Sequence, residues 1–161
     1  MDQVETLCGL LGEEAAVCGA LTAALREEQR AMIALEPEGI FAALGKRRAL
    51  QEELGRLASH RRTLVRDVAR ARGADASSAT ELLVALPPEP RAELLGRLRT
   101  LRRSLLEARG LERQNTLLAR ASLQQTDELL RTLRGLVPGA HYGADAQIAA
   151  PAALESVDRR V

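Results

Sequence analysis

Apolar residues recur at alternating spacings of three and four through three long segments of this chain, and that spacing is the period of an amphipathic helix. They are mostly leucine and alanine, which favour helices, and Phe41 and Tyr142 are the only aromatic residues. A β-sandwich or barrel takes its core from β-branched and aromatic residues, so neither is expected. The chain is therefore predicted to be all-α, and its 161 residues favour a single folded domain.

Proline and glycine divide this pattern into helices. The periodic segments cover residues 2 to about 35, 40 to about 72, and about 91 to 136. Pro37 predicts a tight reversal after the first segment, and Gly73 is a suitable C-cap for the second. Residues 1–136 are expected to form an elongated antiparallel bundle of three long helices, with a short connecting helix at Thr80–Leu86. Residues 137–161 have no sustained period and are expected to be a flexible C-terminal tail.

Charge differs between the three segments. Residues 1–37 carry a net charge of −5, residues 38–72 carry +5, and residues 87–136 carry +4. Since an exposed ion pair contributes only about 0.2–1 kcal/mol, this pattern is predicted to set helix orientation and register more than stability. The whole chain has a net charge of +1 and no aromatic side chains among its arginines, so nucleic-acid binding is not expected.

Membrane insertion and secretion are not expected either. No stretch approaches 18 uncharged apolar residues, and Asp2 and Glu5 stand where a signal peptide would carry positive charge. Cys8 and Cys18 lie about 15 Å apart on one predicted helix, which is too far for a disulfide. We expect both thiols to be buried and reduced, and the protein to be cytoplasmic.

The sequence carries no motif of an enzyme, a cofactor site or a metal centre. His60 and His141 are isolated, whereas a metal site needs several ligands at defined spacings. Adjacent glutamates such as Glu27 and Glu28 point about 100° apart on a helix and do not form an acid–base pair. We therefore expect no catalytic residue, no metal and no cofactor.

Arginine clusters are the strongest basic feature. They comprise Arg61 and Arg62, Arg70 and Arg72, and Arg97, Arg99, Arg102 and Arg103. Such runs usually form a solvated surface whose stems cover apolar side chains. The alternative is a surface for an acidic partner, which salt-dependent binding would indicate.

The third long segment is longer than the other two. Its 45 or so residues would span about 68 Å as a helix, against about 51 Å for each of the first two. Its C-terminal third would then have no bundle to cover it, and an uncovered apolar face often marks a binding site. The residues concerned are Leu129, Leu130, Leu133, Leu136 and Val137.

Polar residues interrupt the apolar stripe in the middle of the same segment, at Glu112, Asn115, Ser122 and Thr126. Two interpretations remain open. Asn115 fixes the register of the helix through a buried hydrogen bond, as single polar core residues do in coiled coils. Alternatively, the helix packs loosely here and can pair with a helix of a client protein.

The residues of this segment and of the tail resemble the FlgN family of flagellar export chaperones, over about residues 2 to 147. The resemblance rests on Leu111-Glu112-Arg113-Gln114-Asn115-Thr116-Leu117-Leu118, on Leu129-Leu130-Arg131-Thr132-Leu133, and on Tyr142-Gly143-Ala144-Asp145 after a Gly/Pro turn. Lys46-Arg47-Arg48-Ala49-Leu50 is also similar to the entry of that family's second helix.

The resemblance implies a cytoplasmic chaperone of the type III flagellar export pathway. It would hold the C-terminal segments of the hook-filament junction proteins FlgK and FlgL and deliver them to the export-gate protein FlhA. The client would fold as a helix on residues Asn115, Leu117, Leu118, Leu129, Leu130, Leu133 and Leu136, and Tyr142 with Gly143 would dock to the gate. The alternative function is a structural coiled-coil scaffold or spacer in which the leucines pair with a second copy, and a client-free chaperone could form the same homodimer.

Overall fold

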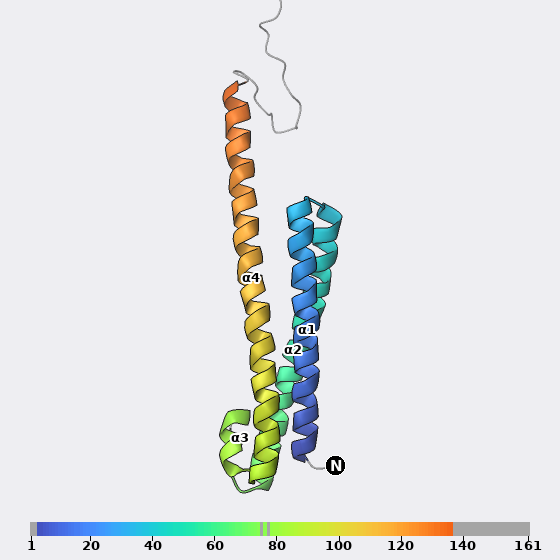
Figure 1. Ribbon diagram of the computed structural model, residues 1–161, viewed down its shortest axis with the longest axis vertical. Coiled ribbons are helices and arrows are strands. Elements are labelled where there is room, and N and C mark those ends of the chain that lie inside the picture. Colours follow the sequence, from blue (N-terminus) through green and yellow to red (C-terminus); the bar gives the residue numbers. More distant parts are fainter. Residues whose placement is uncertain (1–2, 75, 77, 137–161) are drawn as a thin grey trace, which may run out of the picture. The chain divides into compact units, whose positions relative to one another are not determined.

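The computed structural model describes residues 3–74, 76 and 78–136, and these residues form helices and no strand. The helices are α1 (Gln3–Ala34), α2 (Pro37–Ala71), α3 (Ala79–Ala85) and α4 (Pro88–Leu136), drawn in Figure 1. The all-α prediction is confirmed. The chain divides into two compact units, residues 1–118 and 119–161, and α4 contributes to both. The predicted tail, residues 137–161, lies outside the described residues.

Helices α1 and α2 form an antiparallel hairpin, and they lie side by side in Figure 1. Leu35 has a φ of 56° and Pro37 begins α2, so the chain reverses within two residues. A Cβ at Gly39 would come within 3.0 Å of the Cβ of Ala31, which is why a glycine stands where the two helices meet. The backbone N–H of Glu36 donates to the carbonyl of Ala31 at 3.0 Å and closes the turn.

The end of α2 and the short helix α3 are held by caps. Gly73 adopts a φ of 66°, and its N–H donates to the carbonyl of Arg70 at 3.1 Å, as expected of a C-cap glycine. The Ser78 hydroxyl accepts from the N–H of Glu81 at 3.2 Å and caps α3, which is the predicted short helix. At the other end of α3, the Arg91 guanidinium donates to the carbonyls of Leu83 and Val84 at 2.7 and 3.1 Å. These bonds join α3 to the first turn of α4.

The core of residues 1–118 draws one buried residue from every second turn of α4. Leu94, Leu101, Ala108 and Asn115 stand seven residues apart, and each is at most 4% exposed. This seven-residue spacing keeps one face of α4 on its neighbours, as in a coiled coil. The residues that α4 meets in the main cluster include Leu7, Leu11 and Cys18 of α1, Val65 and Val68 of α2, and Leu82 of α3.

Helix α1 is apolar enough to resemble a membrane span by length and composition. An 18-residue window within it has a mean hydropathy of 1.4, and half of that window is buried inside the protein. The apolar side chains concerned build the core with α2, α3 and α4. The high hydropathy of α1 is therefore explained by the side chains that it contributes to the hydrophobic core.

Glu14 is a carboxylate buried on this apolar helix. Its Oε2 accepts from Nη1 of Arg61 on α2 at 2.8 Å, and its Oε1 has no partner among the described residues. Burial raises the pKa of the Glu14 carboxyl, and the nearby positive charge of Arg61 lowers it by less. The folded state therefore holds the proton of Glu14 more tightly than the unfolded chain does.

This difference predicts a pH dependence of stability that Glu14→Gln removes. Over the range from the ordinary pKa of 4.5 up to the raised value, the folded state binds more protons than the unfolded state. The stability of the wild type relative to Glu14→Gln should consequently fall as pH rises through that range, and then level off. Urea unfolding of both proteins between pH 4 and pH 8 measures this difference. A relative stability that rises with pH would contradict the assignment.

Candidate functional site

The predicted site residues on α4 fall into two groups, and the first belongs to the unit of residues 1–118. Asn115 is buried, Leu117 is 64% exposed, and Leu118 is half-buried. Of the three predicted site residues in this unit, only Leu117 therefore exposes a large apolar side chain.

Asn115 lies at a polar contact of all three long helices. Its Nδ2 donates to the carbonyl of Leu25 at 2.8 Å and to Oε2 of Glu28 at 3.2 Å, both on α1. Nη1 of Arg47 on α2 in turn donates to both carboxylate oxygens of Glu28 at 3.1 Å. Asn115 is thus buried and hydrogen-bonded to a neighbouring helix, as the first interpretation requires. Its burial leaves its proposed contact with a client without support.

We name the set Glu28, Arg47 and Asn115 the polar junction. Glu28 and Asn115 are 5% and 2% exposed, and Oδ1 of Asn115 has no partner among the described residues. Next to it, Nε2 of Gln51 on α2 donates to Oε1 of Glu112 on α4 at 3.1 Å. The polar residues of the α4 stripe are therefore engaged with α1 and α2 where the stripe passes from Ala108 to Asn115.

The second group lies on residues 119–136 of α4, the described part of the second unit. Leu129, Leu130 and Leu133 are 45 to 60% exposed, although leucine is usually buried. Leu129 and Leu133 are one turn apart and share a face of the helix. The side chain of Leu136 and the whole of Tyr142 and Gly143 lie outside the described residues.

Leu123 is an exposed leucine of this unit that the sequence interpretation missed. It is 71% exposed and stands seven residues before Leu130, so both lie on the same side of α4. The seven-residue spacing was the signal that could have found it. The apolar surface of residues 119–136 therefore includes two leucine rows, of which the second was only partly anticipated.

Local contacts keep residues 119–136 helical. Asp127 and Arg131 form an ion pair at 3.5 Å, and Gln124 donates to Glu128 at 3.0 Å, each pair four residues apart. Such pairs stabilise a helix by about 0.2–0.5 kcal/mol each. They do not involve the leucines, which stay exposed to solvent.

The described residues do not form a metal site or an activated cysteine nucleophile. No group of three or more His, Cys, Asp and Glu residues there could hold a metal ion. Cys8 and Cys18 are buried, and burial is the main cause that raises the pKa of each thiol. A raised pKa leaves little thiolate at neutral pH, so neither cysteine is set up as a nucleophile.

A comparison with models of known protein families identifies the family to which the chain belongs. The model of the family described as FlgN protein matches residues 1–150. The chain belongs to the FlgN family. FlgN proteins are chaperones of flagellar assembly and are not known as enzymes, which indicates the same class of function here. No curated protein and no solved structure matches the chain.

The polar junction of this FlgN protein predicts that two neighbouring glutamates, Glu28 and Glu27, contribute differently to the free energy of unfolding. Glu28→Ala removes a buried carboxylate and leaves Arg47 and Asn115 without it, so the free energy of unfolding should fall by about 1–3 kcal/mol. Urea denaturation followed by circular dichroism measures this change.

Glu27→Ala is the matched control, because Glu27 pairs with Lys46 at 2.7 Å on the solvent-exposed side of the same two helices. It should change stability by clearly less than Glu28→Ala. Equal effects of the two substitutions would show that the polar junction has no special energetic role.

Proposed function

We propose that this FlgN-family protein is a cytoplasmic export chaperone that binds the C-terminal segments of the hook-filament junction proteins FlgK and FlgL. The observation that carries the proposal is the exposed leucine surface of residues 119–136 in a chain of this family. Leu129, Leu130 and Leu133 form its centre, and Leu117 and Leu118 of the first unit belong to the same proposed set. Leu136 stands seven residues after Leu129 in the sequence and belongs to the same proposed set.

An exposed leucine row on a helix suits a client that folds when it binds. An amphipathic client helix would place its own apolar side chains against Leu129 and Leu133. The client pays the entropy of ordering at that moment, which lowers the affinity for a given buried area. Limited affinity is useful for an export chaperone, because the client has to be released at the gate.

Residues 1–118 would serve as the scaffold of the chaperone. In this proposal α1, α2 and the first part of α4 form a three-helix antiparallel bundle, with the polar junction fixing its register. Two contacts between α1 and α2 support the antiparallel direction of this pair: Lys46 bonds to Glu27 and Arg61 bonds to Glu14. Arg26 of α1 also donates to Glu107 of α4 at 2.8 Å.

The client surface predicts a loss of binding when charge is placed on it. Leu129→Asp together with Leu133→Asp should weaken binding of a FlgK C-terminal peptide at least about tenfold, because two carboxylates would have to be desolvated against the client helix. Isothermal titration calorimetry measures the affinity.

Arg131→Asp is the matched control, since it changes the net charge by the same two units on the opposite side of the helix. It should bind the peptide as the wild type does. Wild-type affinity in the double variant would refute the proposed surface. Light scattering on the free protein tests the scaffold alternative, since a tight dimer that dissociates in the double variant would show that the leucines pair with a second copy.

Tyr142 and Gly143 are the proposed contact with the export-gate protein FlhA. Tyrosine is an apolar ring with a polar tip, and such side chains often anchor interfaces. Tyr142→Ala should weaken binding to the cytoplasmic part of FlhA at least about tenfold while leaving the affinity for the client peptide unchanged. Pull-down with client-loaded protein measures both. Equal loss of client and gate binding would show that the tyrosine supports the fold instead.

A further inference from the structure

A groove runs along the first unit where α2, α3 and α4 meet. Its volume is about 520 Å³, and its apolar lining on α4 consists of Leu95, Leu98, Leu101, Leu105 and Leu106. Leu101 is buried beneath it and Leu106 is 58% exposed, so the lining extends from the core to the surface. A second hollow of about 340 Å³ shares Leu98 and Arg61 and lengthens the groove towards Val65 of α2.

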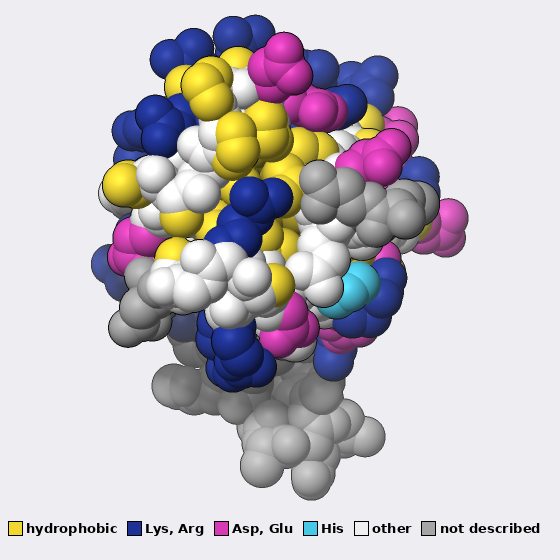
Figure 2. Space-filling model, turned by 90° about the horizontal axis from the view of Figure 1, so that it is seen from below, with side chains coloured by type: hydrophobic (Ala, Val, Ile, Leu, Met, Phe, Trp, Pro, Cys, Tyr) yellow, Lys and Arg dark blue, Asp and Glu magenta, His cyan; other side chains and the backbone are white. Residues whose placement is uncertain are grey.

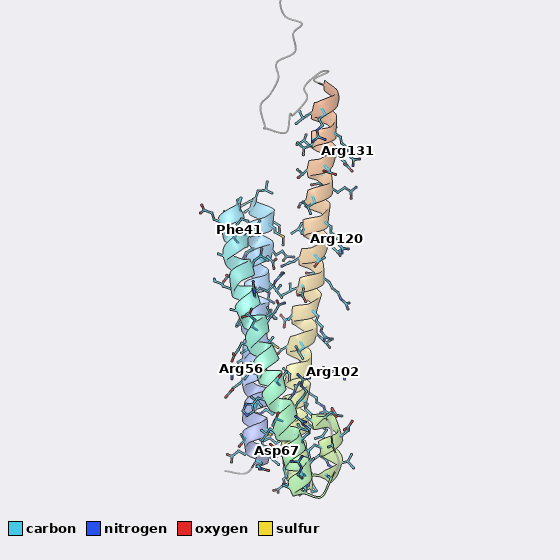
Figure 3. The ribbon with its side chains drawn as sticks, turned by 180° about the vertical axis from the view of Figure 1, so that it is seen from behind. Phe41, Arg56, Asp67, Arg102, Arg120 and Arg131 are labelled. Carbon is cyan, nitrogen blue, oxygen red and sulfur yellow. The ribbon has the colours of Figure 1, made fainter. Side chains whose placement is uncertain are left out.

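Arginines line this groove together with the leucines. Arg99, Arg102 and Arg109 come from α4, and Arg61 comes from α2. Figure 3 labels Arg102 on the part of α4 that adjoins α3. Figure 2 shows the end of the molecule at which α3 lies, where apolar side chains are exposed among both basic and acidic ones.

The charge of these arginines is not balanced within the described part of the chain. Among the described residues, Arg99, Arg102 and Arg109 form no ion pair, and no acidic residue is among those that line the groove. Arg61 uses one nitrogen to hold the buried Glu14. Other arginines of the unit, such as Arg26 and Arg47, do have carboxylate partners. The groove is therefore basic as well as apolar.

The dimensions favour a helix as the occupant. The lining residues of α4 extend from Leu95 to Arg109, which is about 21 Å along a helix axis. A partner helix of about 14 residues has that length. A leucine row flanked by arginines matches a helix with an apolar stripe and carboxylates beside it, because guanidinium and carboxylate groups form paired hydrogen bonds.

We propose that this groove binds an acidic amphipathic helix of a partner protein. The surface is separate from the leucines of residues 119–136, so the interaction is additional to client binding. A second copy of this chain is a poor source of the helix, because Glu14, Glu27 and Glu28 of its acidic α1 are already paired within the protein. Residues 137–161 are a poor source as well, since Asp145, Glu155 and Asp158 are offset by Arg159 and Arg160.

Nucleic acid is disfavoured by the lining itself. None of the residues that line the groove is aromatic, so a base would find no aromatic side chain to stack on there. A phosphate backbone would leave the leucines exposed to water, whereas the apolar face of a helix would cover them. The combination of leucine and arginine therefore favours a protein partner.

The test is a selection with a helical peptide library on the full-length protein. Each 14-residue peptide keeps leucines at helical spacing, and its flanking positions encode Glu, Lys, Gln and Ser in equal amounts. We expect the selected peptides to be enriched in Glu over Lys, and their affinity to fall at least about tenfold in Arg99→Glu with Arg102→Glu. Their affinity should also fall as salt rises from about 50 to 300 mM.

Arg103→Glu with Arg113→Glu is the matched control, because it makes the same change of net charge on α4 without touching residues that line the groove. Peptide affinity in this variant should stay within about twofold of the wild type. Circular dichroism checks that both double variants remain folded. Leu129→Asp with Leu133→Asp should bind the selected peptides normally, which separates this groove from the proposed client surface.

Three results would overturn the proposal. The first is a selection that yields no peptide sensitive to Arg99→Glu with Arg102→Glu. The second is enrichment of Lys over Glu at the flanking positions. The third is binding of poly(U) RNA or of phosphatidylserine vesicles more tightly than of any selected peptide, with loss of that binding in the same groove variant.

Discussion

The burial of two glutamates on α1 is the constraint on which the first unit depends. A buried carboxylate is costly unless cations and hydrogen-bond donors reach it, so Glu14 and Glu28 require α2 to present Arg61 and Arg47 at fixed positions. Glu28 additionally receives Asn115 of α4. A slip of any helix by one turn would leave a buried charge unpaired, whereas leucines and alanines tolerate such slips more easily.

The helices and their ends could be predicted from the sequence because their signals are local. Pro37 and Gly73 stand where the hairpin turns and where α2 ends, since their backbone preferences act without help from distant residues. The start of α4 was placed near Arg91, yet the helix begins at Pro88. Pro88 and Pro90 lie within its first turn, where a helix needs no N–H from them.

The roles of single residues were harder to predict, because they depend on which helices meet. Glu14 and Glu28 interrupted the apolar pattern of the first segment and gave no sign that each would be buried with a partner from α2. Asn115 allowed two interpretations until its amide was seen to reach α1. The arginine clusters likewise gave no sign of a groove, since its leucines come from α3 as well as α4.

Helix α4 keeps one seven-residue spacing while the chemistry at that spacing changes along its length. At Leu94, Leu101 and Ala108 it supplies the core, at Asn115 it supplies a hydrogen-bond donor, and at Leu129 it presents an exposed leucine. The polar junction marks the last buried position of the series, because an asparagine whose Nδ2 donates to α1 ends apolar packing without unwinding the helix. A continuous leucine stripe would instead allow the exposed part of α4 to compete for the α1–α2 hairpin in a shifted register. The interruption at Asn115 therefore separates the leucines that build the core from the leucines that stay exposed to solvent.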